Sequence, residues 1–166
     1  MDQAGAVEDS SAGRLVLIVG LPASGKSTLA RELALRLGAI RLDKDAWVTA
    51  LGFDVWDDEA RVRVEAQLWA LTLELLACGQ TVILEWGHWA RAERDEKRLG
   101  ARALGAGVEL HVLDAPLEEL IERAERRTLS GAWTAAPMTR AHFEEWATIY
   151  EPPDDDERAL FDEPLG

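Results

Sequence analysis

The 166-residue sequence contains one cysteine, no asparagine and no long apolar run. The single cysteine, Cys78, excludes an internal disulfide and a metal site built from several cysteines. Because it ends an apolar helical pattern, we expect its side chain to be buried. No apolar run approaches the roughly 20 residues that a membrane span needs, and residues 1–13 lack the features of a secretory signal. We therefore expect a cytoplasmic protein with no membrane partner.

The sequence also lacks an excess of basic residues. Its net charge is −13, of which −3 lies in residues 1–13 and −6 in residues 151–166, leaving −4 for residues 14–150. Nucleic-acid-binding proteins usually carry a basic patch or stripe, so this distribution disfavours a polynucleotide partner. We expect a disordered acidic N-terminus at 1–13, one domain at 14–153, and an extended acidic tail at 154–166.

Between these ends, short apolar runs alternate with amphipathic segments. The apolar runs predict strands at 14–20, 39–43, 81–85 and 108–114. The amphipathic segments predict helices at 26–37, 59–77, 91–104, about 116–128 and 140–150. The residues at 129–139 are small or turn-forming and predict a loop, with Thr139 as the N-cap of the last helix. Strands that alternate with helices indicate an α/β domain built on a parallel sheet.

A phosphate-binding motif lies where the first predicted strand turns into a helix. Gly20, Gly25, Lys26 and Ser27 match G-x-x-x-x-G-K-[ST] in full. In such a loop the backbone N–H groups and the helix N-terminus bind phosphate, the lysine reaches the β- and γ-phosphates, and the hydroxyl ligates Mg²⁺. We predict a three-layer P-loop NTPase fold that binds ATP, with GTP as the alternative nucleotide, together with Mg²⁺. The predicted loop comprises Gly20, Leu21, Pro22, Ala23, Ser24, Gly25, Lys26, Ser27 and Thr28.

Two classes of P-loop protein fit this motif. One is a nucleotide-driven switch that acts through a protein partner, and the other is a kinase that passes the γ-phosphoryl group to a bound hydroxyl. Guanine-specific switches use an Asn-Lys-x-Asp element, which a sequence without asparagine lacks. No D-x-x-G element follows the loop, and the third predicted strand ends in Glu85, whereas mechanical ATPases usually have an Asp there. These absences favour the kinase, and the switch remains the alternative.

The stretch "GLPASGKSTLARELALRLGAIRLDKDAWVTAL" resembles a group of small P-loop kinases. The group includes the kinase domain of phage polynucleotide kinase, zeta toxins and chloramphenicol phosphotransferase. A weaker resemblance continues through "TVILEWGHWARAER", "LHVLDAPLEELIERAERR" and "FEEWATIYEPP", so that it spans about residues 14–153. Members of this group move phosphate from ATP to a hydroxyl of a nucleic acid end, a nucleotide sugar or an antibiotic. The resemblance therefore implies a phosphotransferase with an alcohol as acceptor, and a small helical lid.

The resemblance also implies roles for the carboxylates that follow the predicted strands. In this group an Asp just after the second strand orients the acceptor hydroxyl, and "RLDKDAW" is most similar to zeta toxins, where the second Asp does so. This implies Asp45 as a catalytic residue. The alternative is that Asp45 caps a helix beginning at Ala46. We expect Asp43 and Glu85, at the carboxyl ends of their strands, to hold Mg²⁺ with Ser27.

Arginines precede the predicted loop at 129–139. Arg123 and Arg127 are four residues apart and share a helix face, with Arg126 beside them. They resemble the lid arginines that surround the ATP phosphates in this group, and such cations stabilise transferring phosphoryl groups. We therefore expect Arg123 and Arg127 to act with Lys26 and Asp45 in catalysis, and Arg126 to bind the nucleotide. The alternative is ordinary pairing of Arg123 and Arg126 with the acids four residues earlier.

Aromatic residues surround the expected acceptor position. Trp47 follows Asp45 closely, and Trp86 and His88 lie just beyond the third strand, with Arg91 after them. Relatives often have a small polar turn at this point, so "EWGHWARAER" departs from their pattern and disfavours a nucleic acid 5′-end as the acceptor. An aromatic wall suits a flat or amphipathic small molecule. The alternatives are core packing for the tryptophans, and helix-surface ion pairs for Arg91 and Arg94.

The sequence thus predicts an ATP-dependent phosphotransferase, monomeric or weakly dimeric, that acts on a hydroxyl of a small molecule such as an antibiotic, a nucleoside or a nucleotide sugar. The alternatives are a nucleotide-binding switch that acts through a protein partner, and a polynucleotide 5′-hydroxyl kinase.

Overall fold

The computed structural model describes residues 12–165, so most of the predicted acidic N-terminus lies outside the described residues. It contains a parallel sheet with the strand order β2-β3-β1-β4. The strands are β1 (Arg14–Val19), β2 (Ile40–Leu42), β3 (Thr81–Leu84) and β4 (Gly107–Val112). Each lies within or next to its predicted range, and the predicted parallel sheet is confirmed.

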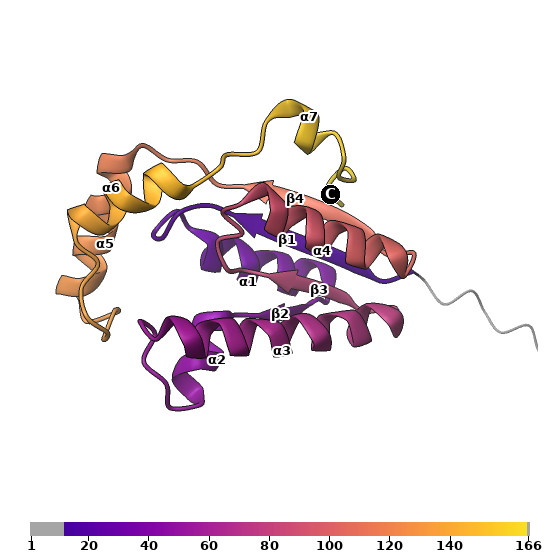
Figure 1. Cartoon of the computed structure of the whole chain (residues 1–166), viewed down its shortest axis with the longest axis horizontal. Helices are drawn as coiled ribbons and strands as arrows, with labels where there is room; N and C mark the ends of the chain where they lie inside the picture. Colours follow the sequence, from indigo (N-terminus) through magenta and orange to yellow (C-terminus); the bar gives the residue numbers. More distant parts are fainter. Residues whose placement is uncertain (1–11, 166) are drawn as a thin grey trace, which may run out of the picture.

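Side chains of β1 alternate between two hydrophobic cores, because successive residues of a strand point to opposite faces of the sheet. Leu15 and Leu17 pack with residues of α3 and α4, whereas Val16 and Ile18 pack with α1. The helices flanking the sheet are α1 (Lys26–Leu37), α3 (Asp58–Ala77) and α4 (Arg91–Ala103). Figure 1 shows α3 and α4 on one face and α1 on the other. The result is the three-layer fold that the sequence predicts.

The predicted lid stands at the end of the sheet where the strands terminate (Figure 1). It consists of α5 (Leu117–Leu129), α6 (Arg140–Ile149) and the loop between them. As predicted, Thr139 caps α6, since its hydroxyl accepts a hydrogen bond from the His142 backbone N at 3.4 Å. The lid has a small core of its own, to which the P-loop contributes Leu21. The lid and the P-loop therefore pack as neighbours.

The acidic C-terminal residues are folded, where the sequence predicts an extended end. They form α7 (Asp155–Arg158) and continue along β4, which is an edge strand (Figure 1). The Asp162 backbone N donates to the Val108 carbonyl at 2.8 Å, and its carboxylate accepts from the Val108 N at 2.7 Å. That carboxylate also pairs with Arg102 at 2.7 Å. The acids thus neutralise arginines of α4 and satisfy the open edge of β4, which composition alone does not reveal.

The position of Cys78 corrects one smaller expectation. Cys78 is the C-cap of α3 and is exposed, not buried as the apolar pattern predicts, because the helix ends just as its last apolar residues leave the core. Among the described residues, no helix combines the length and the apolar character that crossing a membrane requires.

Candidate active site

The loop between β1 and α1 has a backbone that requires glycine. A Cβ on Gly20 would lie 2.7 Å from both the Leu113 carbonyl oxygen and the Ser24 hydroxyl. Gly25 has a φ of 101°, which L side chains rarely adopt, and directly precedes α1. The first N–H groups of α1 have no acceptor within the helix, and the buried Ser24 hydroxyl has no hydrogen-bond partner among the described residues. This loop fits a bound phosphate chain.

Lys26 is folded back onto this loop. Its Nζ donates to the carbonyl oxygens of Gly20 at 3.0 Å and Leu21 at 2.8 Å. Burial lowers the pKa of Lys26 to about 8, the negative charges of Asp45 and Glu85 oppose this shift, and the positive charge of Arg127 adds to it. The charges of Asp45, Glu85 and Arg127, all predicted site residues, thus act on Lys26, although the four residues come from four different segments of the chain.

Glu85 lies buried at the end of β3 and contacts the P-loop. Its carboxylate accepts a hydrogen bond from the Ser27 hydroxyl at 3.1 Å and pairs with Arg41 at 3.1 Å. Burial raises the pKa of Glu85 to about 7, neighbouring Asp43 raises it further, and Arg41 and Ser27 oppose the shift. The sequence analysis missed Arg41, although a strand places residues 41 and 43 on the same face of the sheet.

A hydroxyl and two carboxylates are the type of oxygen ligand that Mg²⁺ prefers, so Ser27, Asp43 and Glu85 fit this ion. The described residues contain no group of three or more His, Cys, Asp or Glu side chains placed to hold a metal. Mg²⁺ ordinarily takes one or two carboxylates and completes its shell with water and substrate phosphate, which this donor set allows.

Asp45 lies in the first turn of α2 (Lys44–Ala50) with its side chain half exposed. Its carboxylate accepts from Arg61 Nη1 at 2.7 Å, and the same nitrogen donates to the Val55 carbonyl at 2.9 Å. The alternative role for Asp45 as a helix cap is wrong. Asp43 is the N-cap, because its Oδ1 accepts from the Ala46 N at 3.0 Å. The Asp45 carboxylate is thus not used by the helix backbone, and Arg61 is a neighbour that the sequence analysis missed.

The lid arginines differ in their contacts. Arg123 donates to the Ala23 carbonyl of the P-loop at 3.3 Å and also pairs with Glu119. Arg127 lies over the Trp133 ring, 5.9 Å from its centroid, and its charge lowers the pKa of Lys26. Arg126 is exposed, and its Nε donates to a carbonyl of its own helix. Arg123 and Arg127 therefore lie toward the P-loop, and Arg126 does not contact it.

The residues predicted to bind the acceptor are dispersed. Trp47 is 42% exposed and lines a cavity of about 290 Å³ between α2 and α3. Trp86 and His88 are buried. Neither Trp86 Nε1 nor His88 Nε2 has a hydrogen-bond partner among the described residues. Arg91 lies beside the C-terminal segment, 3.7 Å from Asp95 and 3.8 Å from Asp154. Of the residues predicted to bind the acceptor, only Trp47 is both exposed and on the same helix as Asp45.

The sequence indicates a helix-surface ion pair for Arg94. Instead it is completely buried, and its guanidinium pairs with the buried Glu157 of α7. Periodicity places Arg94 on a polar helix face. The folded C-terminal residues, which are distant in sequence, supply its carboxylate partner.

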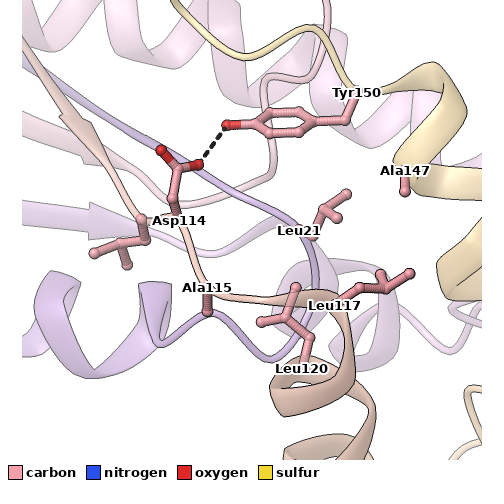
Figure 2. Close-up of a pocket in the computed structure, with 8 residues that line it drawn as sticks. Leu21, Asp114, Ala115, Leu117, Leu120, Ala147 and Tyr150 are labelled. Atoms are coloured by element: carbon pink, nitrogen blue, oxygen red, sulfur yellow. Dashed lines mark hydrogen bonds between the residues drawn. The ribbon is translucent and has the colours of Figure 1, made fainter.

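A second cavity lies between the P-loop and the lid. It has a volume of about 180 Å³ and is lined mainly by apolar side chains, among them Leu21, Leu117 and Leu120. Figure 2 shows its polar edge, where the Tyr150 hydroxyl donates to Asp114 Oδ1 at 3.5 Å. Burial and the Asp114 charge raise the pKa of Tyr150 to about 12, so the phenol stays protonated. No residue predicted to bind the acceptor lines this cavity.

The parallel sheet, the glycine-dependent loop after β1 and the helical lid define a P-loop nucleotide-binding fold. Residues 15–153 match the family described as the AAA domain, and the chain belongs to this family. Among curated proteins the chain has no match.

Several solved structures share this fold. A Chloroflexus aurantiacus J-10-fl protein assigned as a kinase is 24% identical, with 86% of this chain and 83% of that chain covered and a TM-score of 0.71. The Mycobacterium tuberculosis APS kinase CysC, in complex with AMPPNP and APS, is 22% identical, with 87% and 86% covered and a TM-score of 0.60. A chain of the Pnkp1/Rnl/Hen1 RNA repair complex is 23% identical, with 86% and 45% covered and a TM-score of 0.70. These likenesses confirm the predicted three-layer P-loop fold.

Proposed function

We propose that this protein transfers the γ-phosphoryl group of ATP to a hydroxyl of a small-molecule acceptor. The observation that carries the proposal is the position of the Asp45 carboxylate near the amine of Lys26, outside the P-loop and unused by the helix backbone. In a switch that hydrolyses its nucleotide, a polar side chain beside the γ-phosphate positions only the attacking water. A kinase needs one that faces both the acceptor and the γ-phosphate.

The P-loop residues hold the nucleotide. Main-chain N–H groups at the start of α1 bind the phosphates, and Lys26 turns from the Gly20 and Leu21 carbonyls to the β- and γ-phosphates. Ser27, Asp43 and Glu85 hold Mg²⁺, which when bound neutralises charge that develops on the phosphate oxygens. Arg123 and Arg127 contribute positive charge from the lid.

Asp45 orients the acceptor. The phosphoryl-transfer transition state is loose, so the attacking hydroxyl needs alignment more than early deprotonation, and an ionised carboxylate supplies that alignment. Arg61 holds the Asp45 carboxylate in place through an ion pair of 2.7 Å. The acceptor oxygen forms the new bond to the γ-phosphorus, the bond to the leaving ADP oxygen breaks, and the hydroxyl proton passes to Asp45 or to water.

A small molecule is favoured over a polynucleotide as the acceptor. Residues 14–150 carry a net charge of only −4, with no basic excess to follow a phosphate backbone. Exposed Trp47 offers an aromatic surface on the same helix as Asp45. The APS kinase with the same fold is named for a small-molecule substrate. The chain of the RNA repair complex keeps a 5′-hydroxyl oligonucleotide among the acceptors to be tested.

The test is a transfer assay with γ-labelled ATP against antibiotics, nucleosides, nucleotide sugars and 5′-hydroxyl oligonucleotides. We expect the wild-type protein to label a small-molecule class. Asp45→Asn should lose about 10²-fold in transfer rate while its affinity for ATP stays within twofold of wild type. Asp58→Asn, in the first turn of α3, is the matched control and should leave both unchanged. Transfer by Asp45→Asn at the wild-type rate would contradict the proposed role, and labelling of the oligonucleotide alone would contradict the proposed acceptor.

A further inference from the structure

We propose that Trp89 is a positioning residue for the P-loop. Its indole keeps the Gly20 carbonyl hydrogen-bonded when Lys26 leaves that carbonyl for the triphosphate, and a buried ion pair to the C-terminal segment holds Trp89 in place. This inference rests on the proposed nucleotide binding and concerns residues outside the P-loop motif.

The Gly20 carbonyl oxygen has two donors. Lys26 Nζ lies 3.0 Å away, and Trp89 Nε1 lies 3.2 Å away. Gly20 is buried, and a buried carbonyl that loses its only partner costs free energy because water cannot replace that partner. When Lys26 swings to the phosphates, the Trp89 bond remains. The indole therefore lowers the cost of the lysine movement on which nucleotide binding depends.

The loop after β3 is shaped to present this indole. A Cβ on Gly87 would lie 2.4 Å from Trp89 Nε1, so only glycine allows the ring to lie there. The Gly87 carbonyl in turn accepts a hydrogen bond from the Gly20 N at 3.4 Å. His88, which lies between Gly87 and Trp89 in the sequence, has a φ of 46°, a strained value for a residue that is not glycine. A strained backbone needs support from its surroundings.

Arg94 supplies that support. Its Nη1 donates to the His88 carbonyl at 2.8 Å and to the Trp89 carbonyl at 3.0 Å. Its Nε and Nη2 donate to the two carboxylate oxygens of Glu157, at 2.6 and 2.9 Å. Arg94 and Glu157 are 0% and 1% exposed, so this bidentate pair is shielded from water. A continuous set of hydrogen bonds thus runs from α7 through Arg94 and Trp89 to the P-loop.

A second ion pair anchors the same C-terminal segment without contacting the loop after β3. Asp162 pairs with Arg102 and bonds the edge of β4. Loss of either pair should loosen the segment, but only the Glu157–Arg94 pair leads to Trp89. A comparison of variants in the two pairs therefore distinguishes an effect on the position of Trp89 from a general loss of stability.

The test measures the affinity of the full chain for Mg²⁺·AMPPNP by calorimetry. Trp89→Phe keeps the aromatic packing and removes the N–H donor, and we expect affinity to fall about tenfold, since a buried carbonyl is left unpaired in the complex. Trp69→Phe changes an indole that packs against Lys97 and Gly100 on α4, and should leave the affinity within twofold of wild type. Equal affinity in Trp89→Phe and wild type would overturn the proposal.

The second arm compares Glu157→Gln with Asp162→Asn. In ¹⁵N spectra, the Trp89 indole N–H, assigned by its absence in Trp89→Phe, should exchange slowly in the wild type with and without nucleotide. Glu157→Gln should accelerate this exchange and weaken AMPPNP binding at least threefold, whereas Asp162→Asn should lower the unfolding temperature without either effect. An equal loss of affinity in both variants would reduce the ion pair to a structural role and overturn the link to α7. Absence of AMPPNP binding by the wild type would instead overturn the proposed function.

Discussion

The two halves of the candidate site are built in different ways. The phosphate half is a single run of residues, Gly20 to Thr28, in which backbone groups and two glycines form the binding surface. The proposed acceptor half is assembled from α2 and α3, and side chains such as Asp45, Arg61 and Trp47 form its surface. A contiguous backbone loop leaves a spacing pattern in the sequence, and an assembled side-chain surface does not.

The electrostatics differ in the same way. In the phosphate half the dominant group is Lys26, whose pKa is lowered chiefly by burial, so its charge is poorly compensated until an anion arrives. In the acceptor half Asp45 is paired with Arg61 and half exposed. The environment of Lys26 thus suits a strongly charged ligand, as the proposed function requires.

The largest effect is expected in the phosphate half. Lys26→Met should lower the transfer rate about 10³-fold, because it removes the cation that stabilises negative charge on the γ-phosphate during transfer. Its thermal stability should equal or exceed that of the wild type, because the variant no longer buries an amine whose charge is disfavoured there. Transfer assays with γ-labelled ATP and thermal unfolding measure the two. A large loss of stability without loss of transfer would contradict the assignment.

The lid arginines sharpen the comparison within one helix. Arg127→Ala should lower kcat about 10²-fold, because its charge reaches the Lys26 environment. Arg126→Ala, its neighbour, should change kcat no more than twofold, since it is exposed and contacts its own helix. Steady-state kinetics with saturating ATP provide the measurement, and equal losses in the two variants would remove the distinction.

The pH dependence of nucleotide affinity tests the Lys26 environment. Just below pH 8 Lys26 is already protonated and Glu85, with a pKa of about 7, is largely ionised, so affinity should change little there. Above that pH the amine must take up a proton as the triphosphate binds, so affinity should fall by up to about tenfold per pH unit. Because the pKa in the folded state lies below that of an unfolded lysine, stability without nucleotide should rise from about pH 8 to 10.5. In Lys26→Met both dependences should disappear, and calorimetry at several pH values measures them.

The smallest effect is expected in the acceptor half. Trp47→Ala should raise the KM for the acceptor about fivefold, through loss of an apolar contact, and leave the affinity for ATP unchanged. Initial rates at varied acceptor concentration give this value once a substrate is known. A change in ATP affinity of the same size would place Trp47 in the wrong half of the site.

The accuracy of the sequence predictions follows the same division. Helix α1 has the bounds that its apolar spacing and Gly38 predict, because a helix after a buried strand is determined by local signals. Asp43, not Asp45, caps α2, since the choice between two nearby carboxylates depends on where β2 ends. The burial of Arg94 and the docking of Glu157 could not be predicted, because the two residues pair across 63 positions of the chain and no local pattern signals such a contact.

The central claim is that main-chain amides of the loop after β1 bind the phosphates of ATP and that Lys26 turns toward them. A crystal structure of the full chain with Mg²⁺ and AMPPNP tests this most directly. The account predicts phosphate oxygens within hydrogen-bond distance of the backbone N–H groups at the start of α1, with Lys26 Nζ on the β- and γ-phosphates and Trp89 still bonded to the Gly20 carbonyl. Lys26 still bonded to the Gly20 and Leu21 carbonyls, with the nucleotide bound elsewhere or not at all, would contradict it.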